Sequence, residues 1–177
     1  MKTDKQAAHL SRTVIGSPVG PLTLVASDGA LTGLYLDGRA PAAVEAAAGS
    51  VIEADAPVLA EAERQLGEYF AGQRQTFDLP LALRGTEFQQ RVWDALRRVG
   101  YGETVSYRQL ADELGQPTAA RAVGLANGRN PVSIIVPCHR VVGSDGGLTG
   151  YGGGLPNKRR LLDLERQGRA ETLPGTS

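Results

Sequence analysis

Residues 106–128 read SYRQLADELGQPTAARAVGLANG, and their pattern indicates the fold of the second half of the chain. Ser106 and Gln109 match a capping box, in which each side chain covers a free amide of the other residue, so a short helix is predicted to begin here. The segment Gly115-Gln116-Pro117 ends that helix, and Thr118 is a suitable N-cap for a second one. Two short helices with so tight a break between them predict a helix-turn-helix unit.

The second helix of this pair is built almost entirely from small residues. Such a helix packs closely against another helix of the same protein, or it lies in a groove of DNA, and the pattern leaves both interpretations open. The minor groove, about 6 Å wide, favours small side chains, and helix N-termini and arginines hold phosphates. Without base-reading side chains, the helix would bind with little sequence preference. The candidate DNA-binding residues are Thr118, Ala119, Ala120, Arg121, Ala122, Gly124 and Ala126.

The first half of the chain has the signals of a small sheet with one helix. The β-like runs are residues 12–15, 22–26, 31–36 and 77–83. Asp28-Gly29 is a hairpin signal between two of these runs. Apolar residues at helical spacing from Pro57 onward predict a helix, with Gly72 as its stop. The alanine-rich residues 40–49 form either a loop or a weak helix.

The composition shifts near Gly85, where Thr86 and Gln89 match another capping box and predict a helix. Pro156 suits the first turn of a last helix that ends at Gly168. The predicted fold class is α+β, with a small N-terminal sheet-plus-helix domain followed by a mainly helical C-terminal domain that contains the helix-turn-helix. The predicted divisions are a flexible tail at 1–10, an α+β domain at 11–84, a C-terminal domain at 85–169 and a flexible tail at 170–177.

Composition and charge exclude several classes of protein. The 177 residues are 41% hydrophobic and 21% charged, as in ordinary globular proteins. One cysteine and two histidines exclude an internal disulfide and a cysteine-rich zinc site, so neither a metal nor another cofactor is expected. With no apolar run of about 20 residues and no secretory signal, we expect a cytoplasmic protein that does not enter membranes.

The charge is unevenly distributed although its sum is zero. Residues 1–84 carry 7 Lys/Arg against 10 Asp/Glu, whereas residues 85–177 carry 12 against 9. An anionic partner is therefore expected on the second half.

The only cysteine, Cys138, precedes His139 in the segment IIVPCHRVVG, residues 134–143. One interpretation is a buried cysteine in a core strand, because free cysteine is often buried. The other is a nucleophile, which needs a base to become a thiolate. Neighbouring side chains of an extended chain point to opposite faces. A direct contact between Cys138 and His139 would therefore require a turn, and a water that carries the proton is the favoured alternative.

Two charged residues lie on the apolar face of the last predicted helix. Glu165 follows Leu161 at i+4, and Lys158 precedes Leu161 by three residues. An acid on an apolar face usually has a partner, which makes Glu165 a candidate to orient His139. A solvated edge of the face remains an equally good interpretation.

The segment GGLTGYGGGL, residues 146–155, places six glycines around Tyr151. Such a loop lets backbone groups approach a ligand closely, and one aromatic wall suits a flat heterocycle. A plain mobile loop is the alternative.

Five motifs in this order resemble the O6-alkylguanine-DNA alkyltransferases, also called methylated-DNA–protein-cysteine methyltransferases. They are RGTEFQQRVWDAL, GETVSYRQLA, AARAVGLANGRNP, IIVPCHRVVG and LTGYGGG, and they cover residues 85–165 densely. The resemblance implies a DNA repair enzyme that flips O6-alkylguanine out of duplex DNA and transfers the alkyl group irreversibly to itself, once per molecule.

The resemblance also implies roles for single residues. Cys138 would accept the alkyl group, His139 would act as base through a water, and Glu165 would hold His139. Asn130 would be a hinge residue. Tyr107 would donate a proton to the departing guanine.

The remaining implied roles concern the base and the DNA. Arg121 would enter the stack where the base has left. Main-chain groups around Cys138, Val141 and Gly152 would read the base edge, Tyr151 would pack on its face, and Lys158 would order the loop. The implied partner is double-stranded DNA, bound through the minor groove by a monomer; O4-alkylthymine as a substrate and cooperative loading are left open. The alternatives are a cysteine hydrolase and a non-enzymatic lesion-binding or regulatory module.

Overall fold

The computed structural model describes residues 9–36, 38–46 and 50–172. Its N-terminal part is an antiparallel sheet in the order β1 (Ser11–Ile15), β2 (Leu22–Ser27) and β3 (Ala30–Leu36). The turn between β2 and β3 has φ values of 51° at Asp28 and 75° at Gly29. This is the two-residue hairpin that the Asp-Gly signal predicts, because two successive positive φ values match the twist of the strands. All six residues of β2 are buried.

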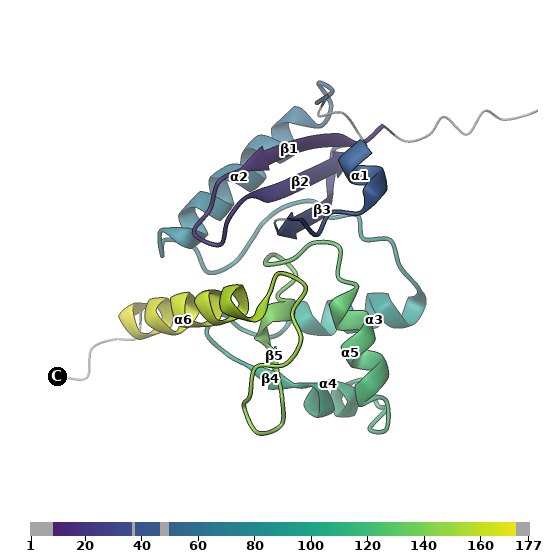
Figure 1. The fold of residues 1–177 in the computed structure, drawn as a ribbon, viewed down its shortest axis with the longest axis vertical. Coiled ribbons are helices and arrows are strands. Elements are labelled where there is room, and N and C mark those ends of the chain that lie inside the picture. Colours follow the sequence, from purple (N-terminus) through teal and green to yellow (C-terminus); the bar gives the residue numbers. More distant parts are fainter. Residues whose placement is uncertain (1–8, 37, 47–49, 173–177) are drawn as a thin grey trace, which may run out of the picture.

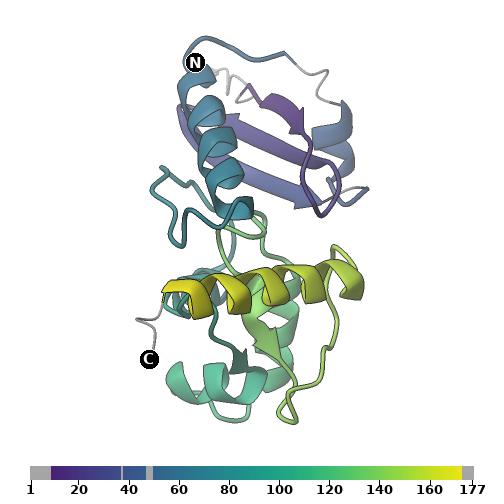
Figure 2. The same ribbon diagram turned by 90° about the vertical axis from the view of Figure 1, so that its left-hand side faces the viewer.

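Two helices accompany the sheet, and the longer one covers one of its faces (Figures 1 and 2). The short α1 is Ala42–Ala46, and α2 is Ala56–Phe70, with a proline in its first turn as the sequence indicates. The apolar face of α2 buries Leu66 and Tyr69 completely. The predicted helix is therefore confirmed, and its packing against β2 and β3 forms the N-terminal core.

The C-terminal part contains the predicted helices α3 (Glu87–Arg97), α4 (Tyr107–Glu113) and α5 (Ala120–Gly128). Both capping boxes are present, with the side chains of Thr86 and Ser106 accepting from the N3 amides. α3 and α4 both pack against α5, which gives the helix-turn-helix arrangement seen in Figure 1.

The described residues of the C-terminal part form four further elements, namely two short strands, a 3₁₀ turn and a last helix. A parallel pair joins β4 (Val105–Ser106) to β5 (Val141–Val142), and a 3₁₀ turn, η1 (Cys138–Arg140), precedes β5. The last helix, α6 (Leu155–Thr172), crosses beneath the N-terminal sheet in Figure 2. The short parallel pair was not predicted, since two-residue strands leave no periodicity in a sequence.

The two parts share one hydrophobic core cluster. The edge of β3 also pairs with the segment before the cysteine, because Leu34 N donates to Pro131 O (2.9 Å) and Ser133 N donates to Leu34 O (3.1 Å). The N-terminal sheet thus fixes the backbone that leads to Cys138.

Residues 77–83 do not form the predicted strand. Only an isolated bridge joins Leu81 to Leu31, through bonds from Leu31 N to Pro80 O and from Ala82 N to Leu31 O. Pro80 has no N–H to donate to a ladder, so the pairing does not extend.

Two predicted helix boundaries are wrong. α5 begins one residue later than expected: Ala119, not Thr118, is its N-cap, and no side chain caps it. α6 continues through Gly168 to Thr172. A Cβ at Gly168 would collide with the Tyr101 ring, so this glycine permits close packing and does not stop the helix.

The fold class is α+β, as predicted. The predicted C-terminal tail, 170–177, begins inside α6, and its residues 173–177 lie outside the described part. Of the predicted N-terminal tail, residues 1–8 also lie outside it. Within the described ranges, no helix combines the length and apolar character that a membrane span requires.

Candidate functional site

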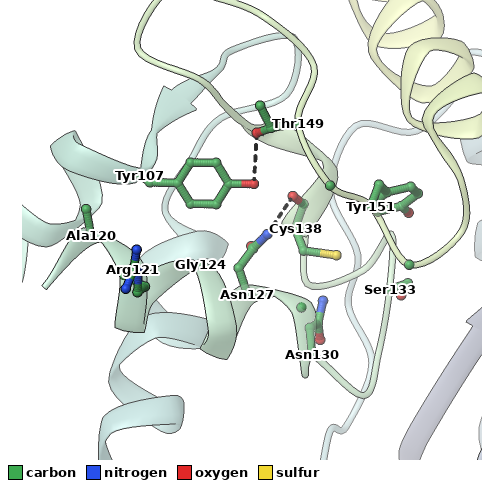
Figure 3. A pocket seen from close by; sticks show the side chains of 13 residues that line it. Tyr107, Ala120, Arg121, Gly124, Asn127, Asn130, Ser133, Cys138, Thr149 and Tyr151 are labelled. Carbon is green, nitrogen blue, oxygen red and sulfur yellow. Dashed lines mark hydrogen bonds between the residues drawn. The ribbon is translucent and has the colours of Figure 1, made fainter.

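A cavity of about 690 Å³ opens between α5, the start of α4 and the glycine-rich loop, with Cys138 in its wall (Figure 3). The site residues expected from the sequence that line it are Tyr107, Ala120, Arg121, Gly124, Asn130, Cys138, Tyr151 and Gly152. Segments that are far apart in the sequence therefore meet at one cysteine.

Five lining residues were not predicted: Asn127, Gly128, Ser133, Thr149 and Gly150. Asn127 follows the buried Val123 at i+4, so it is a polar residue on the buried side of α5. That position was a usable signal, because a buried amide needs partners. Asn127 Nδ2 donates to Cys138 O at 3.4 Å (Figure 3). Thr149 and Gly150 lie in the glycine-rich segment that the sequence indicated as a possible ligand loop, whereas Gly128 and Ser133 carry no comparable sequence signal.

The chain turns at Cys138 and is not extended there, because Cys138–Arg140 form the 3₁₀ turn. Even so, no hydrogen bond joins the thiol to the imidazole of His139. Burial raises the pKa of Cys138, while hydrogen bonding by Asn130 and Ser133 and the charge of Lys158 act in the opposite direction. The resting sulfur is therefore a thiol whose surroundings are already arranged to stabilise a thiolate.

His139 and Glu165 form a fully buried pair, with 2.6 Å between His139 Nε2 and Glu165 Oε1. Burial lowers the pKa of His139, so the imidazole is neutral at rest. A neutral ring that donates from Nε2 leaves Nδ1 as its proton acceptor, and Nδ1 has no partner among the described residues.

Glu165 receives four further hydrogen bonds, two of them from Arg140. Arg140 binds it in a bidentate fork, with Nε to Oε2 and Nη2 to Oε1 both at 2.9 Å. Tyr69 Oη donates to Oε1 at 2.8 Å, and Gly102 N donates to Oε2 at 3.4 Å. Burial raises the pKa of Glu165, but the hydrogen bonds from His139 and Arg140 and the charge of Arg140 outweigh it and hold the pKa at about 2. The open choice for Glu165 is thus resolved in favour of a buried, partnered carboxylate.

Among the described residues of the N-terminal part, Tyr69 alone contributes to this network, and it comes from the apolar face of α2. Burial, followed by the charge of Glu165, raises the pKa of Tyr69 well above its usual value, so its hydroxyl remains a proton donor. Nothing in the spacing of residues 96 positions apart signals this contact.

Asn130 connects the end of α5 to the cysteine segment. Its Nδ2 donates to Val136 O at 2.7 Å, and its Oδ1 accepts from Val132 N at 3.0 Å. The side chain therefore braces the loop that carries Cys138 while also facing the sulfur (Figure 3).

The glycine-rich loop is tied down at Thr149. Lys158 Nζ, fully buried, donates to Thr149 O at 2.7 Å, and Thr149 Oγ1 lies 3.4 Å from Tyr107 Oη. The plain mobile loop considered from the sequence is therefore replaced by one that is anchored to α4 and α6.

The exposed side of α5 is narrower than its small residues suggested. Ala126 is buried and its carbonyl accepts from Trp93 Nε1 at 2.9 Å, so Ala126 cannot present its side chain to a groove. Val141 is also buried, in β5, outside the lining of the cavity. The remaining candidates Thr118, Ala119 and Ala122 lie at or near the surface outside the cavity lining.

Two residues that line the cavity have a buried polar atom without a partner. Of the five such side-chain atoms among the described residues, Asn127 Oδ1 and Tyr151 Oη belong to the lining, and His139 Nδ1 belongs to the residue after Cys138. Burial raises the pKa of Tyr151 well above its usual value, so it too is a neutral donor. Unsatisfied polar atoms in the residues that line a cavity indicate a polar ligand or ordered water.

Two family descriptions match adjoining parts of the chain. Residues 10–83 match "6-O-methylguanine DNA methyltransferase, ribonuclease-like domain", and residues 87–167 match "6-O-methylguanine DNA methyltransferase, DNA binding domain". The methylated-DNA–protein-cysteine methyltransferase of Mycobacterium tuberculosis H37Rv is 53% identical over 152 residues, which cover 86% of this chain and 90% of that protein.

Solved structures agree with these matches. The crystal structure of M. tuberculosis O6-methylguanine methyltransferase superposes with a TM-score of 0.80 at 50% identity, covering 89% of this chain and 93% of that one. The M. tuberculosis protein in complex with DNA superposes with a TM-score of 0.76 at 48% identity, covering 89% and 94% of the two chains.

Proposed function

Because the chain belongs to the O6-methylguanine DNA methyltransferase family, we propose that it repairs DNA by transferring the alkyl group of O6-alkylguanine to its own Cys138. The observation that carries the proposal is a lone thiol in the wall of a cavity beside a buried His139–Glu165 pair. DNA is the partner, and the roles of single residues below rest on the geometry of this cavity.

The transfer is a displacement at the alkyl carbon. The Cys138 sulfur forms a bond to that carbon while the bond from carbon to guanine O6 breaks, and the bonding pair leaves with O6. The thiol proton passes through a water to His139 Nδ1, the one ring nitrogen without a partner. Tyr107 donates a proton to the departing base, so guanine leaves neutral.

The surroundings of the sulfur favour the charge that develops on it. Asn130, Ser133 and Lys158 all lower the pKa of Cys138 against the effect of burial. Glu165 stabilises the imidazolium that His139 becomes when it takes the proton, which is how an orienting acid supports a base. The thioether product has no second cysteine to resolve it, so each molecule reacts once.

The cavity receives the base outside the duplex. Tyr107 and Tyr151 supply its aromatic walls, with main-chain groups of Cys138 and Gly152 at the base edge. Flipping costs a few kcal/mol, least for a base whose pairing is already weakened, such as an O6-alkylated guanine. A side-chain wedge offsets part of that cost, and Arg121 lies at the rim of the cavity in position to be that wedge.

The proposed docking face is the exposed side of α5 with the turn before it, from Thr118 to Gly124, placed in the minor groove. The protein acts there as a monomer, and residues 11–84 and 85–169 form its two domains.

A cysteine hydrolase needs the base hydrogen-bonded to its nucleophile, and no hydrogen bond joins the Cys138 thiol to the His139 imidazole. A purely lesion-binding module would not need the buried His139–Glu165–Arg140 network. Alkyl transfer uses both the cysteine and the network.

The proposal is tested with a duplex that carries one O6-methylguanine labelled in its methyl group. We expect the protein to gain the mass of one CH₂ group, located on the peptide that contains Cys138, with one transfer per molecule. The same duplex with unmodified guanine is the control and should leave the mass unchanged. Label that stays on the DNA under excess protein, or more than one transfer per molecule, would refute the proposal.

Arg121→Ala should slow reaction with the duplex by about tenfold or more, because the flipped state loses the side chain that replaces the base in the stack. Reaction with free O6-methylguanine, which needs no flipping, should change far less. Arg166→Ala, on α6 and paired with Asp163, is the matched control. Equal losses with duplex and free base would remove the wedge role from Arg121.

A further inference from the structure

A second hollow, of about 510 Å³, lies directly beside the reaction cavity. The two share Gly128, Asn130, Ser133 and Gly152 in their linings, so the hollows adjoin along these four residues. The second hollow extends from this shared rim toward the end of β3, in the N-terminal part.

Three arginines from three separate segments line this hollow: Arg39 after β3, Arg84 before α3 and Arg129 after α5. All three are exposed, and none has a side-chain partner among the described residues. By contrast, Arg64, on the outer face of α2, binds two glutamates. The described lining of the hollow contains no acidic residue at all. Uncompensated positive charge collected in one concave site predicts an anionic ligand.

Backbone contacts hold the end of β3, near Arg39, against the segment that follows Arg129. The Leu34 backbone pairs with Pro131 and Ser133, which lie two and four residues beyond Arg129. A Cβ on Gly153 would collide with Leu36, so the glycine loop packs directly on the end of β3. The hollow is therefore a preformed groove.

We propose that this groove binds the phosphodiester backbone of the damaged DNA strand next to the flipped nucleotide. The proposal rests on the proposed function, because a nucleotide that enters the reaction cavity stays covalently joined to its neighbours. Its strand must leave the cavity across the rim, and the shared rim leads into the arginine groove. Guanidinium groups bind phosphate oxygens in a bidentate fashion. The N-terminal part thus contacts DNA directly, through Arg39, in addition to supporting the cysteine loop.

The test replaces all three arginines by glutamine and measures binding to an unmodified duplex, with Cys138 intact, at several salt concentrations. Each lost phosphate contact lowers the slope of log affinity against log salt by about 0.9. We therefore expect the slope to become shallower by about two to three, and affinity at low salt to fall at least about tenfold. Replacement of the same three residues by lysine should restore most of the slope.

Arg166→Gln, which removes one positive charge on α6 outside the groove, is the matched control and should change the slope by much less. An unchanged slope in the glutamine variant, or an equal loss in the lysine variant, would overturn the proposal. Methyl transfer to Cys138 is measured on the same preparations with free O6-methylguanine. Failure of wild-type transfer would refute the proposed function, whereas normal transfer with an unaltered slope would refute only the groove.

A neutral methylphosphonate linkage, placed at one position at a time along the damaged strand, locates the contact. In the wild-type protein, substitution beside the flipped nucleotide should slow transfer, and in the glutamine variant the same substitution should add little further loss. If the arginine substitutions and the methylphosphonate linkage slowed transfer independently, so that their effects were additive, the arginines would not contact that strand.

Discussion

Cys138→Ser is expected to abolish alkyl transfer while affinity for duplex DNA stays within about threefold of the wild-type value. Serine is close to cysteine in size, so the 3₁₀ turn and the cavity should persist. Its hydroxyl cannot be ionised by an imidazole at neutral pH as a thiol can, and it is a poor nucleophile at carbon without such activation. The measurements are labelled-methyl transfer and binding to a duplex that contains O6-methylguanine.

Ser133→Ala is the matched control, because it removes a neighbouring hydroxyl from the same cavity and leaves the sulfur in place. It should slow transfer without abolishing it, since Ser133 is one of several groups that lower the pKa of Cys138. Transfer by the serine variant at a rate comparable with that of Ser133→Ala would show that another residue accepts the alkyl group.

Glu165→Gln should destabilise the protein by about 4 kcal/mol, because removing one partner of a buried ion pair leaves the other charge uncompensated. Arg140 would lose the carboxylate of its bidentate fork, and the amide of glutamine would direct a donor at groups that are themselves donors. Transfer should also slow by about 100-fold, since His139 loses the charge that favours its protonated form. Urea unfolding and single-turnover rates with free O6-methylguanine measure the two effects.

Tyr69→Phe is the control for this network. It removes one hydrogen bond to Glu165 and leaves every charge paired. The free energy of unfolding is therefore expected to fall by only about 2 kcal/mol. If Tyr69→Phe lowered the free energy of unfolding as much as Glu165→Gln does, packing around Tyr69, and not the charge on Glu165, would support the site. Retention of wild-type rates by folded Glu165→Gln would remove Glu165 from the proton path.

The acid side of the rate profile tests the state of His139. The pKa of His139 is lowered by burial, so its neutral, proton-accepting form persists below the ordinary histidine value of 6.5. The fall in transfer rate as pH decreases should therefore have its midpoint below pH 6.5. In Glu165→Gln the carboxylate that raises the pKa of His139 is gone, so the fall should move to still lower pH. A fall centred above pH 7 would contradict this account.

Elements defined by neighbouring residues were predictable from the sequence. The capping boxes at Thr86 and Ser106 and the Asp28-Gly29 hairpin each depend on residues within four positions, and each is present. Features that depend on contacts between residues far apart in the sequence were not predicted correctly. Gly168 resembles a helix stop, but it lies within α6 and its missing Cβ leaves space for the Tyr101 ring, which no local pattern reveals.

The same distinction holds within the site. His139, beside Cys138, and Glu165, on an apolar stripe, were recognisable as candidates from their neighbours. The Tyr69 hydroxyl and the Asn127 amide were not proposed, because a tyrosine at a core position and an asparagine in a helix full of small residues each have an ordinary explanation. The arginine groove is assembled from three segments and has no linear motif.

The hydrogen bond from Tyr69 to Glu165 joins positions 96 residues apart, and Cys138 lies between them in the sequence. During synthesis on the ribosome, the sulfur therefore emerges before the carboxylate that completes its proton path. A nascent chain would carry an unactivated thiol. The protein would become able to react only when α6 packs beneath the N-terminal sheet, which is synthesised first.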